Sequence, residues 1–379
     1  MSLQLTDEQQ SIVSTVRGFA AKECGSREQR LALTDGGRTH NNMEISRKLA
    51  KLGFIGLSIP EQYGGSGGGL FDACVFLEEL TYNQVPLASF GVTLIVSHMY
   101  LKSAAEDLKR EILGSVVAGR PTAVAMSEPG SGSDVASLRC RAEKVDGGYR
   151  INGQKTWISN AQISDHILLV ARTSDTGQKH QGISMISVPT STPGVEIRLI
   201  ETMGLEVNDV FFTDCEVGPE RIVGVEGQGW TQLIAGLNTE RVIIGALALG
   251  QARRAFDDTL AYVQQREQFG RPVGSFQALS HRLADMATEI ECTRLLVYDV
   301  AQRVDENPGQ LIPREASMVK LKATELAKHA ALEGMQMMGG MGYTAEGGME
   351  AQLRAAVVGT VVGGTSEIQR DIIAKTYGL

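Results

Sequence analysis

The sequence lacks the residue patterns of metal sites and of disulfide frameworks. Its six histidines never stand at H-x-x-x-H spacing and no C-x-x-C is present, so the sequence predicts no metal site. The cysteines are odd in number and widely spaced, and they are Cys24, Cys74, Cys140, Cys215 and Cys292. We therefore expect free thiols in a reducing compartment rather than paired cysteines.

Basic clusters and long apolar runs are also missing. The 379 residues include 44 acidic and 36 basic side chains, and no basic run is longer than a pair. This balance argues against nucleic acid or an anionic membrane as a partner, and favours a small molecule or another protein. No apolar run has the ~18 residues of a membrane span, and the N-terminus has no signal-peptide pattern. We expect a soluble, cytoplasmic protein without a membrane partner.

The fingerprints of common nucleotide-binding folds are absent as well. Despite 43 glycines, the chain has no G-x-G-x-x-G and no G-x-x-x-x-G-K-[ST]. Strand-like and helix-like segments do not alternate along the chain, as they would in a doubly wound sheet. The sequence therefore disfavours the common nicotinamide and nucleoside-triphosphate enzymes.

What the chain does contain is three successive kinds of pattern. Helical spacing of apolar residues dominates residues 1–120, short β-rich runs broken by turn signals fill 121–229, and helical spacing returns over 230–379. We predict an α+β fold with an N-terminal helical domain, a middle β domain and a C-terminal helical bundle. Two local signals are sharp: a capping box of Thr6 with Gln9, and Asn152-Gly153 as the strongest hairpin turn.

Three loops contain small or aromatic residues suited to a ligand. Residues 64–68 match G-x-S-x-G, but they follow a helical region among further glycines, which favours a plain loop over a nucleophile elbow. AMSEPGSGSD, residues 125–134, suits either a phosphate or heterocycle site or an ordinary surface turn. KTWISN, residues 155–160, contains Trp157, which is either a core residue or a flat platform for a ligand.

Glu240 is the carboxylate that the helical pattern singles out. It lies on the apolar stripe of WTQLIAGLNTERVIIGALALG, three residues after Leu237 and four before Ile244. Such a buried glutamate can simply be paired with an arginine. Burial among apolar side chains also raises the pKa of a carboxyl group, as a general base near neutral pH requires. Glu240 is therefore a candidate base.

The segment VVGGTSEIQR, residues 361–370, predicts a turn that leads into a helix. Two glycines precede Ser366 and Gln369, whose S-x-x-Q spacing predicts a capping box. A turn of this kind offers backbone N–H groups to an anion or to a polarised carbonyl. REQFGRPVGSFQ, residues 266–277, and QMMGGMGYTAE, residues 336–346, predict either helix hairpins or an arginine site for a pyrophosphate.

Together these motifs resemble the acyl-CoA dehydrogenase family. AMSEPGSGSD is similar to its flavin loop, usually T-E-P-x-x-G-S-D. INGQKTWISNA, REQFGRPVGSFQ, QMMGGMGY and GGTSEIQR resemble four further signatures in the same order. The match covers essentially the whole chain. The resemblance implies FAD as cofactor, commonly a homotetramer, oxidation of the Cα–Cβ bond of an acyl thioester, and electron-transfer flavoprotein as the electron acceptor.

The resemblance also implies roles for individual residues. In the middle domain, Met126, Ser127 and Ser133 would line the isoalloxazine and pyrophosphate, and Trp157 and Ser159 would face the ring near its N5 atom. Other cofactor positions lie in the C-terminal domain, the first six of them reaching the FAD of a neighbouring subunit: Arg266, Gln268, Phe269, Gln277, Gln336, Gly340, Thr365 and Glu367. The implied substrate contacts are Ser133, Asn238 and Arg241.

Two motifs depart from the common pattern of the family. Many members place the base just before the Gly-Thr of the last motif, where this chain has Gly363. Isovaleryl-CoA and long-chain members instead carry the base within a Glu-Arg pair on the helix that here contains Glu240. In QLRAAVVG, residues 352–359, Ala355 and Val357 replace the usual Asp and Lys, which calls an inter-element polar contact into question.

These features predict a mechanism. We expect Glu240 to remove the α-proton of an acyl thioester while the β-hydrogen leaves as hydride to flavin N5, with the N–H of Gly363 polarising the thioester carbonyl. Three alternatives stay open: a flavin monooxygenase or hydroxylase of the same fold, a dehydrogenase of acyl-carrier-protein thioesters, and a non-catalytic subunit of a hetero-oligomer.

Overall fold

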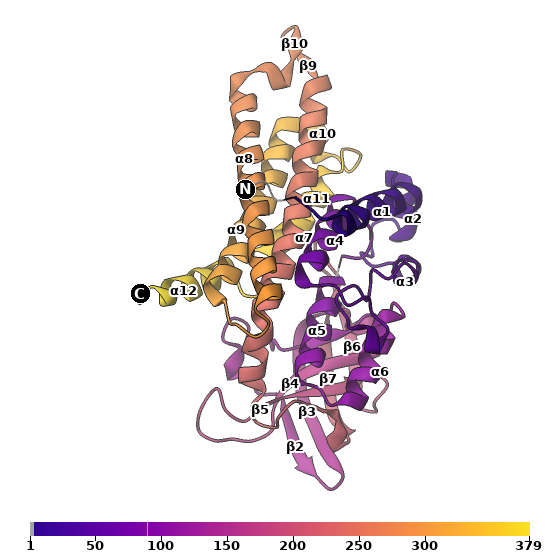
Figure 1. Cartoon of the computed structure of the whole chain (residues 1–379), viewed down its shortest axis with the longest axis vertical. Helices are drawn as coiled ribbons and strands as arrows, with labels where there is room; N and C mark the ends of the chain where they lie inside the picture. Colours follow the sequence, from indigo (N-terminus) through magenta and orange to yellow (C-terminus); the bar gives the residue numbers. More distant parts are fainter. Residues whose placement is uncertain (1–3, 89) are drawn as a thin grey trace. The chain divides into compact units, whose positions relative to one another are not determined.

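The computed structural model describes residues 4–88 and 90–379. Helices come first, strands follow from residue 123, and helices return from residue 229 (Figure 1). The predicted α+β fold, helical then β then helical, is confirmed. The chain forms two compact units. The sheet unit comprises Leu31–Gly68 and Pro86–Leu237, and the helical unit comprises Met1–Arg30, Gly69–Val85 and Asn238–Leu379.

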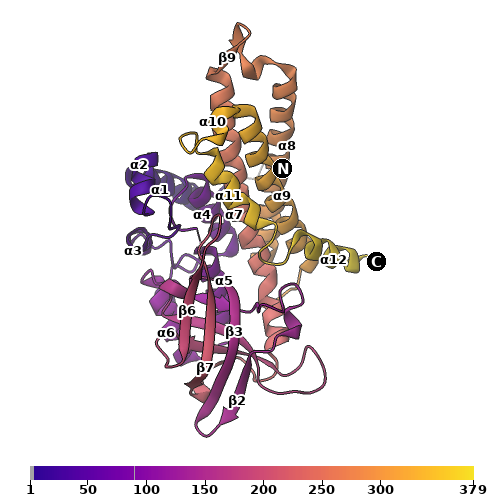
Figure 2. The same cartoon turned by 180° about the vertical axis from the view of Figure 1, so that it is seen from behind.

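The sheet unit is built on eight strands in the order β6-β7-β3-β2-β4-β5-β8, with β1 parallel to β4. The strands β2, β3, β6 and β7 are seen together in Figure 2. Their bounds are β1 Ala123–Ala125, β2 Arg141–Val145, β3 Gly148–Ser159, β4 His166–Arg172, β5 Ile183–Pro189, β6 Val195–Ile200, β7 Val207–Val217 and β8 Ile222–Val223. The α-helices of this unit are α3 Met43–Lys51, α5 Phe90–Ser103 and α6 Glu106–Val117.

The core of the sheet unit follows the alternation of the strands. Ile151 of β3, Leu169 of β4, Val188 of β5 and Phe212 of β7 are all buried and belong to one apolar cluster. Alternate residues on a strand point to opposite faces, and residues 207–212 of β7 alternate between half-buried and buried. The alternation is interrupted in β3, whose register with β7 shifts twice.

The predicted hairpin at Asn152-Gly153 is wrong. These residues lie inside β3, and the hairpin that joins β2 to β3 turns at Gly147, between the paired Val145 and Gly148. The pairing of β3 with β7 shifts its register just after Ile151. The Asn152 side chain satisfies this bulge by accepting from Asp214 N at 2.9 Å and donating to Asp214 Oδ1 at 3.1 Å. The Asn-Gly signal therefore marks a β-bulge and not a chain reversal.

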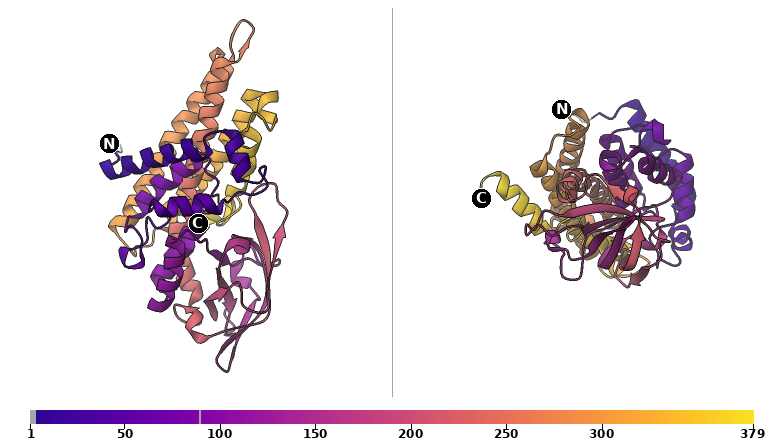
Figure 3. Two further views of the ribbon diagram at one scale, coloured as in Figure 1. Left: turned by 90° about the vertical axis from the view of Figure 1, so that its right-hand side faces the viewer. Right: turned by 90° about the horizontal axis from the view of Figure 1, so that it is seen from below.

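The helical unit contains the long helices of the chain (Figure 3). Its members are α1 Asp7–Cys24, α4 Leu70–Tyr82, most of α7 Gly229–Gln265, α8 Gln277–Glu306, α9 Pro313–Met338, α10 Gly340–Tyr343, α11 Met349–Gly359 and α12 Ser366–Thr376. The helix α9 packs against α8, α11 and α12. A short hairpin of β9 Glu267–Gln268 and β10 Arg271–Pro272 joins α7 to α8. The helix α2, Arg27–Leu33, crosses the limit between the units.

The helix α1 begins as the sequence predicts. Thr6 Oγ1 accepts from Gln9 N at 3.2 Å and Gln9 Oε1 accepts from Thr6 N at 3.0 Å, so the capping box is confirmed.

The serine of the G-x-S-x-G match does not follow a strand. Ser66 lies in a loop, where its N–H donates to Gly56 O at 3.0 Å and its hydroxyl donates to Gly53 O at 3.3 Å. A nucleophile elbow needs a strand before the serine, so this loop does not have that geometry.

The helix α7 is the one helix within residues 4–88 and 90–379 that is long and apolar enough to cross a membrane. Some 65% of its most apolar window is buried inside the protein. The core helix of a soluble protein passes the same test of length and composition, so α7 alone is weak evidence for a membrane span.

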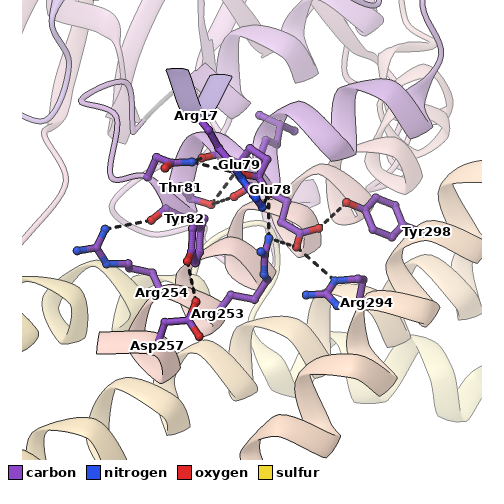
Figure 4. A network of polar contacts seen from close by, with 12 residues as sticks. Arg17, Glu78, Glu79, Thr81, Tyr82, Arg253, Arg254, Asp257, Arg294 and Tyr298 are labelled. Carbon is purple, nitrogen blue, oxygen red and sulfur yellow. Dashed lines mark hydrogen bonds and ion pairs between the residues drawn. The ribbon is translucent and has the colours of Figure 1, made fainter. Parts of the chain in front are cut away.

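Buried charges connect α4 to other helices of the helical unit (Figure 4). Glu79 of α4 accepts from Arg17 of α1 at 2.7 and 2.8 Å and from Arg253 of α7 at 3.2 Å. The neighbouring Glu78 accepts from Arg253 and from the Tyr298 hydroxyl of α8. Both carboxylates are buried, and each has several donors, as buried charges require.

Candidate active site

Glu240 lies on α7 within the helical unit and is 7% exposed. Glu240 is therefore buried as predicted, although the buried surface of α7 is wider than a single stripe of residues. Val242 and Ile243 are fully buried as well, whereas Leu237 and Ile244 of the predicted stripe are half-buried. Glu240 forms no ion pair at 4.0 Å or less with any described residue. The interpretation of Glu240 as half of an arginine ion pair thus finds no support.

Burial sets the protonation behaviour of Glu240. Loss of contact with water raises the pKa of the carboxyl group to about 7, against the opposing attraction of Arg241 and Lys320. Its Oε2 atom is buried and has no hydrogen-bond partner among the described residues. A carboxyl group with this pKa and an unpaired oxygen can accept a proton near neutral pH.

The predicted substrate residues Asn238 and Arg241 lie on the same helix. Arg241 is 9% exposed, and its Nη1 atom is 3.4 Å from Asn238 Oδ1. Burial lowers the pKa of the Arg241 guanidinium, and its buried Nε has no partner among the residues described. The cluster therefore contains two unpaired polar atoms, Glu240 Oε2 and Arg241 Nε. Buried polar atoms are normally paired, and exceptions call for a functional or structural reason.

Gly363 lies directly against Glu240. Its φ is +64° and that of Gly364 is +83°, so the backbone at both positions is left-handed. A Cβ atom built on Gly363 would lie 3.5 Å from Glu240 Oε1 and 2.3 Å from Ile244 Cδ1. Packing against Ile244 thus requires glycine, and the Glu240 carboxylate is within contact distance of the position where a side chain at residue 363 would begin.

The predicted capping box at Ser366 and Gln369 is wrong. The helix α12 begins at Ser366 with Thr365 as its N-cap, and Thr365 Oγ1 accepts from Ile368 N at 3.3 Å. Because Thr365 occupies the capping position, Gln369 is free to turn back toward the glycines. Its Nε2 atom donates to Gly363 O and to Gly364 O, both at 3.0 Å.

Lys320 of α9 completes this arrangement. Its ammonium nitrogen donates to Gly364 O at 2.8 Å from a fully buried side chain. The carbonyl oxygens of Gly363 and Gly364 are thus both held, whereas neither N–H donates to an acceptor in the described part of the chain. No sequence motif pointed to Lys320, and Gln369 was predicted only as part of the cap. A lysine among the buried Ala316, Val319 and Ala323 was the available signal for the former.

A second cluster lies in the sheet unit around the loop after β1. Glu128 is 8% exposed and accepts from Lys155 Nζ at 2.8 Å, from Arg139 N at 2.7 Å and from Cys140 N at 2.8 Å. Lys155 also donates to Met126 O at 2.8 Å, and Thr156 N donates to Ser127 O at 2.9 Å. These contacts join the Met126–Ser127 segment to β3. The sequence contained both charged residues, but neither was assigned a role.

Trp157 projects from an irregular point of β3. The register with β7 shifts between Lys155 and Ile158, so one extra residue is present on β3. Trp157 has φ +63° there and is 61% exposed. Bulges often re-aim a side chain near an active site, and non-glycine residues with left-handed φ are concentrated at such sites. The core interpretation of Trp157 is wrong, and the exposed ring is available as a platform.

Comparison with known proteins identifies the family. The models for the N-terminal, middle and C-terminal domains of acyl-CoA dehydrogenase match residues 6–120, 123–215 and 227–378. The mitochondrial isovaleryl-CoA dehydrogenase of Arabidopsis thaliana is 33% identical, over 99% of this chain and 92% of that protein. The chain belongs to the acyl-CoA dehydrogenase family.

Solved structures share this fold. An acyl-CoA dehydrogenase from Geobacillus kaustophilus is 32% identical with a TM-score of 0.93, over 100% of both chains. The FAD complex of PigA is 28% identical with a TM-score of 0.93, also over 100% of both chains. Members of the family are FAD-dependent oxidoreductases that act on a CH–CH bond, and this chain is one of them.

The sheet unit of this acyl-CoA dehydrogenase fits the cofactor. A flat heterocycle can stack on an exposed aromatic face, which Trp157 supplies, and the nearby Ser127 and Ser159 are half-buried hydroxyl donors. Ser133 is exposed on the same loop, and Cβ atoms built on Gly130 and Gly132 would meet nothing within 4 Å. The loop therefore has room for a bound group. The aromatic ring, the hydroxyl groups and the open loop of this region therefore suit the ring system and the phosphates of FAD.

The remaining residues that are predicted to contact the cofactor lie in the helical unit. Arg266, Gln268 and Phe269 are exposed on the hairpin after α7, where Phe269 is 94% exposed. Arg266 is separated from Glu240 by roughly 39 Å along α7, at 1.5 Å per residue. The hairpin therefore belongs to no common site with Glu240 in the same chain. The other predicted cofactor residues lie at or beside the ends of helices. Four of them are exposed, namely Gln277, Gln336, Gly340 and Glu367, and Thr365 is half-buried.

No group of three His, Cys, Asp or Glu side chains within residues 4–88 and 90–379 could hold a metal ion. The five cysteines are free thiols, four of them buried and Cys292 exposed. The expectation of unpaired cysteines is confirmed.

Proposed function

We propose that this acyl-CoA dehydrogenase oxidises the Cα–Cβ bond of an acyl thioester with Glu240 as the base that removes the α-proton. The observation that carries the proposal is the buried Glu240 carboxylate, unpaired at Oε2 and in contact distance of the bare Gly363. Its pKa, raised by burial to about 7, matches a base that works near neutral pH.

Each of these residues would have a distinct role in the reaction. Glu240 accepts the α-proton. The unpaired N–H of Gly363 donates a hydrogen bond to the thioester carbonyl, which stabilises the negative charge that develops on its oxygen. The Met126–Ser127 segment and Trp157 would hold FAD, with Ser133, Asn238 and Arg241 as substrate contacts. Bound FAD would supply the acceptor for the hydride that leaves Cβ.

The substitution Glu240→Gln tests the base. It keeps the size and polarity of the side chain but removes the proton acceptor, so we expect bleaching of the flavin by an acyl thioester to slow about 10²-fold or more. Anaerobic stopped-flow absorbance measures the rate, and the absorbance of the purified protein reports bound FAD. Glu289→Gln, which changes a half-exposed carboxylate on α8, is the matched control. Wild-type bleaching by the Glu240→Gln protein would refute the assignment.

A relocation of the base tests the contact between the two positions. Glu240→Gly combined with Gly363→Glu places a carboxylate on the turn, and Ile244→Ala removes the atom that a Cβ at residue 363 would meet. We expect partial recovery of flavin bleaching relative to Glu240→Gly alone. No recovery in a protein that retains FAD would show that the two positions do not address the same Cα.

The substrate and acceptor form a further part of the proposal. A CoA thioester is the proposed substrate, and an acyl-carrier-protein thioester is the alternative, because both present the acyl group on phosphopantetheine. A panel of acyl thioesters scored by flavin bleaching would identify the acyl group and the carrier. Electron-transfer flavoprotein is the proposed acceptor, and stoichiometric oxygen consumption in its place would favour the monooxygenase alternative.

The assembly and location are proposed from the family pattern. The exposed hairpin with Arg266, Gln268 and Phe269 supports a homotetramer in which these residues reach the FAD of a neighbouring subunit. Sedimentation of the yellow protein would give the oligomeric state, and a colourless, inactive chain would favour the non-catalytic alternative. We also propose a cytoplasmic location, because the five cysteines are free thiols, as expected in a reducing compartment.

A further inference from the structure

The Gly363–Gly364 turn is held by two side chains of different charge. Lys320 Nζ donates to Gly364 O at 2.8 Å, and Gln369 Nε2 donates to Gly363 O and Gly364 O at 3.0 Å. Both side chains are fully buried. A carbonyl oxygen and the following N–H belong to one planar peptide unit, so holding the oxygens also orients the turn.

The charge of Lys320 is not needed to hold the carbonyl. Taking an ammonium group out of water is unfavourable unless its surroundings compensate, and a neutral donor would make the same hydrogen bond. Burial lowers the pKa of Lys320 to about 8, against the attraction of Glu240. A cation is therefore retained at a position where its burial is unfavourable.

Several charged groups face Lys320. From α7 these are Glu240 and Arg241, and from α12 the group is Glu367, while Glu325 lies on α9 itself. Glu325 and Glu367 are half-exposed and exposed, respectively, so water screens their charges. Glu240 is the buried anion of the set, and its interaction with the Lys320 ammonium is screened least.

We propose that Lys320 is a positioning residue of this active site, which rests on the proposed function of Glu240. Its ammonium group holds the turn through Gly364 O and stabilises the ionised form of the facing Glu240. Gln369 holds the same turn without contributing charge. The turn thereby keeps the left-handed conformation in which the N–H groups of both glycines stay unpaired, while the base stays ionisable at physiological pH.

The two variants Lys320→Met and Gln369→Leu separate the roles. Both remove donors to the turn, and we expect each to slow flavin bleaching at least about tenfold, the effect of one lost buried hydrogen bond. Only Lys320→Met removes a positive charge beside Glu240. We therefore expect Lys320→Met alone to move the midpoint of the pH–rate profile upward, by about one pH unit.

The titration of Glu240 can be followed without turnover. Infrared spectra recorded against Glu240→Gln isolate the protonated carboxyl band of Glu240, and its pH midpoint should rise in Lys320→Met and stay unchanged in Gln369→Leu. Lys322→Met is the matched control, because Lys322 lies on α9 two residues away, is half-exposed and pairs with Glu289. We expect it to leave the rate and the midpoint unchanged.

The results can refute the inference in distinct ways. An unshifted infrared midpoint in Lys320→Met would overturn the role of the charge, and wild-type bleaching by both variants would overturn the role of the turn. If Glu240→Gln bleaches at the wild-type rate, the proposed base fails, whereas the infrared shift still tests the coupling of Lys320 with Glu240. If Lys320→Met does not fold, Lys320→Gln removes the same charge, and its infrared midpoint decides.

Discussion

Glu128 in the sheet unit and Glu240 in the helical unit are buried to the same extent but have opposite surroundings. Their exposed fractions are 8% and 7%. Burial alone would raise both pKa values, but for Glu128 the Lys155 ammonium and two backbone N–H groups outweigh it, so its pKa is lowered. No such donors compensate Glu240, and its pKa is raised to about 7.

The difference teaches that bonding, rather than burial, decides what a buried carboxylate can do. Glu128 accepts three hydrogen bonds and joins the loop after β1 to β3, so it serves as a structural anchor. Glu79 in Figure 4 belongs to the same kind, because Arg17 and Arg253 hold it and its pKa is lowered despite burial. Glu240 retains an unpaired oxygen and can accept a proton.

Removing the partner of Glu128 is expected to have the largest effect on stability. Lys155→Met leaves a buried carboxylate without its cation, so we expect the free energy of unfolding to fall by about 3–5 kcal/mol. Urea unfolding followed by far-UV circular dichroism measures the change. Arg198→Met, at the exposed pair with Glu196, should change stability by less than about 1 kcal/mol. Equal losses in both variants would show that the Glu128 contact is no stronger than a surface pair.

Removing the charge of Glu240 is expected to raise the free energy of unfolding, whereas Lys155→Met is expected to lower it. A folded-state pKa of about 7, above the usual 4.5, stabilises the fold below pH 4.5, and this stabilisation is lost as pH rises through 7. Glu240→Gln has no charge to bury, so we expect it to be more stable than the wild type above pH 7, by about 3 kcal/mol.

Urea unfolding between pH 4.5 and 8 follows this difference, which should grow as pH rises. A stability difference that does not change with pH would mean that Glu240 does not titrate in this range. The comparison with Glu128 would then lose its basis, because both carboxylates would stay ionised.

A methyl group at Gly363 should have a smaller effect on stability. Gly363→Ala forces a left-handed φ on a residue with a Cβ and meets Ile244 Cδ1, so we expect a loss of about 1–3 kcal/mol. Flavin bleaching should slow as the turn shifts away from Glu240. Gly130→Ala, where a Cβ would meet nothing within 4 Å, is the matched control. Identical unfolding curves for the two variants would contradict the packing at Gly363.

The sequence by itself was sufficient for the fold class, the order of its parts and the family. Periodicity distinguishes helices from strands, because it reflects which side chains of one element face the core. The same reasoning identified Glu240 as a buried carboxylate on its helix. Spacing within a single element determines this property, so the tertiary structure was not needed for it.

Only the tertiary structure decided which residues meet. Glu240 of α7, Lys320 of α9 and the turn at Gly363 come from three separate parts of the chain, and their contacts depend on how those helices pack. Local competition decided the cap of α12, where Thr365 took the position predicted for Ser366. The register shifts between β3 and β7 placed Asn152 inside a strand and exposed Trp157. These shifts depend on a partner strand distant in sequence, which local propensity does not contain.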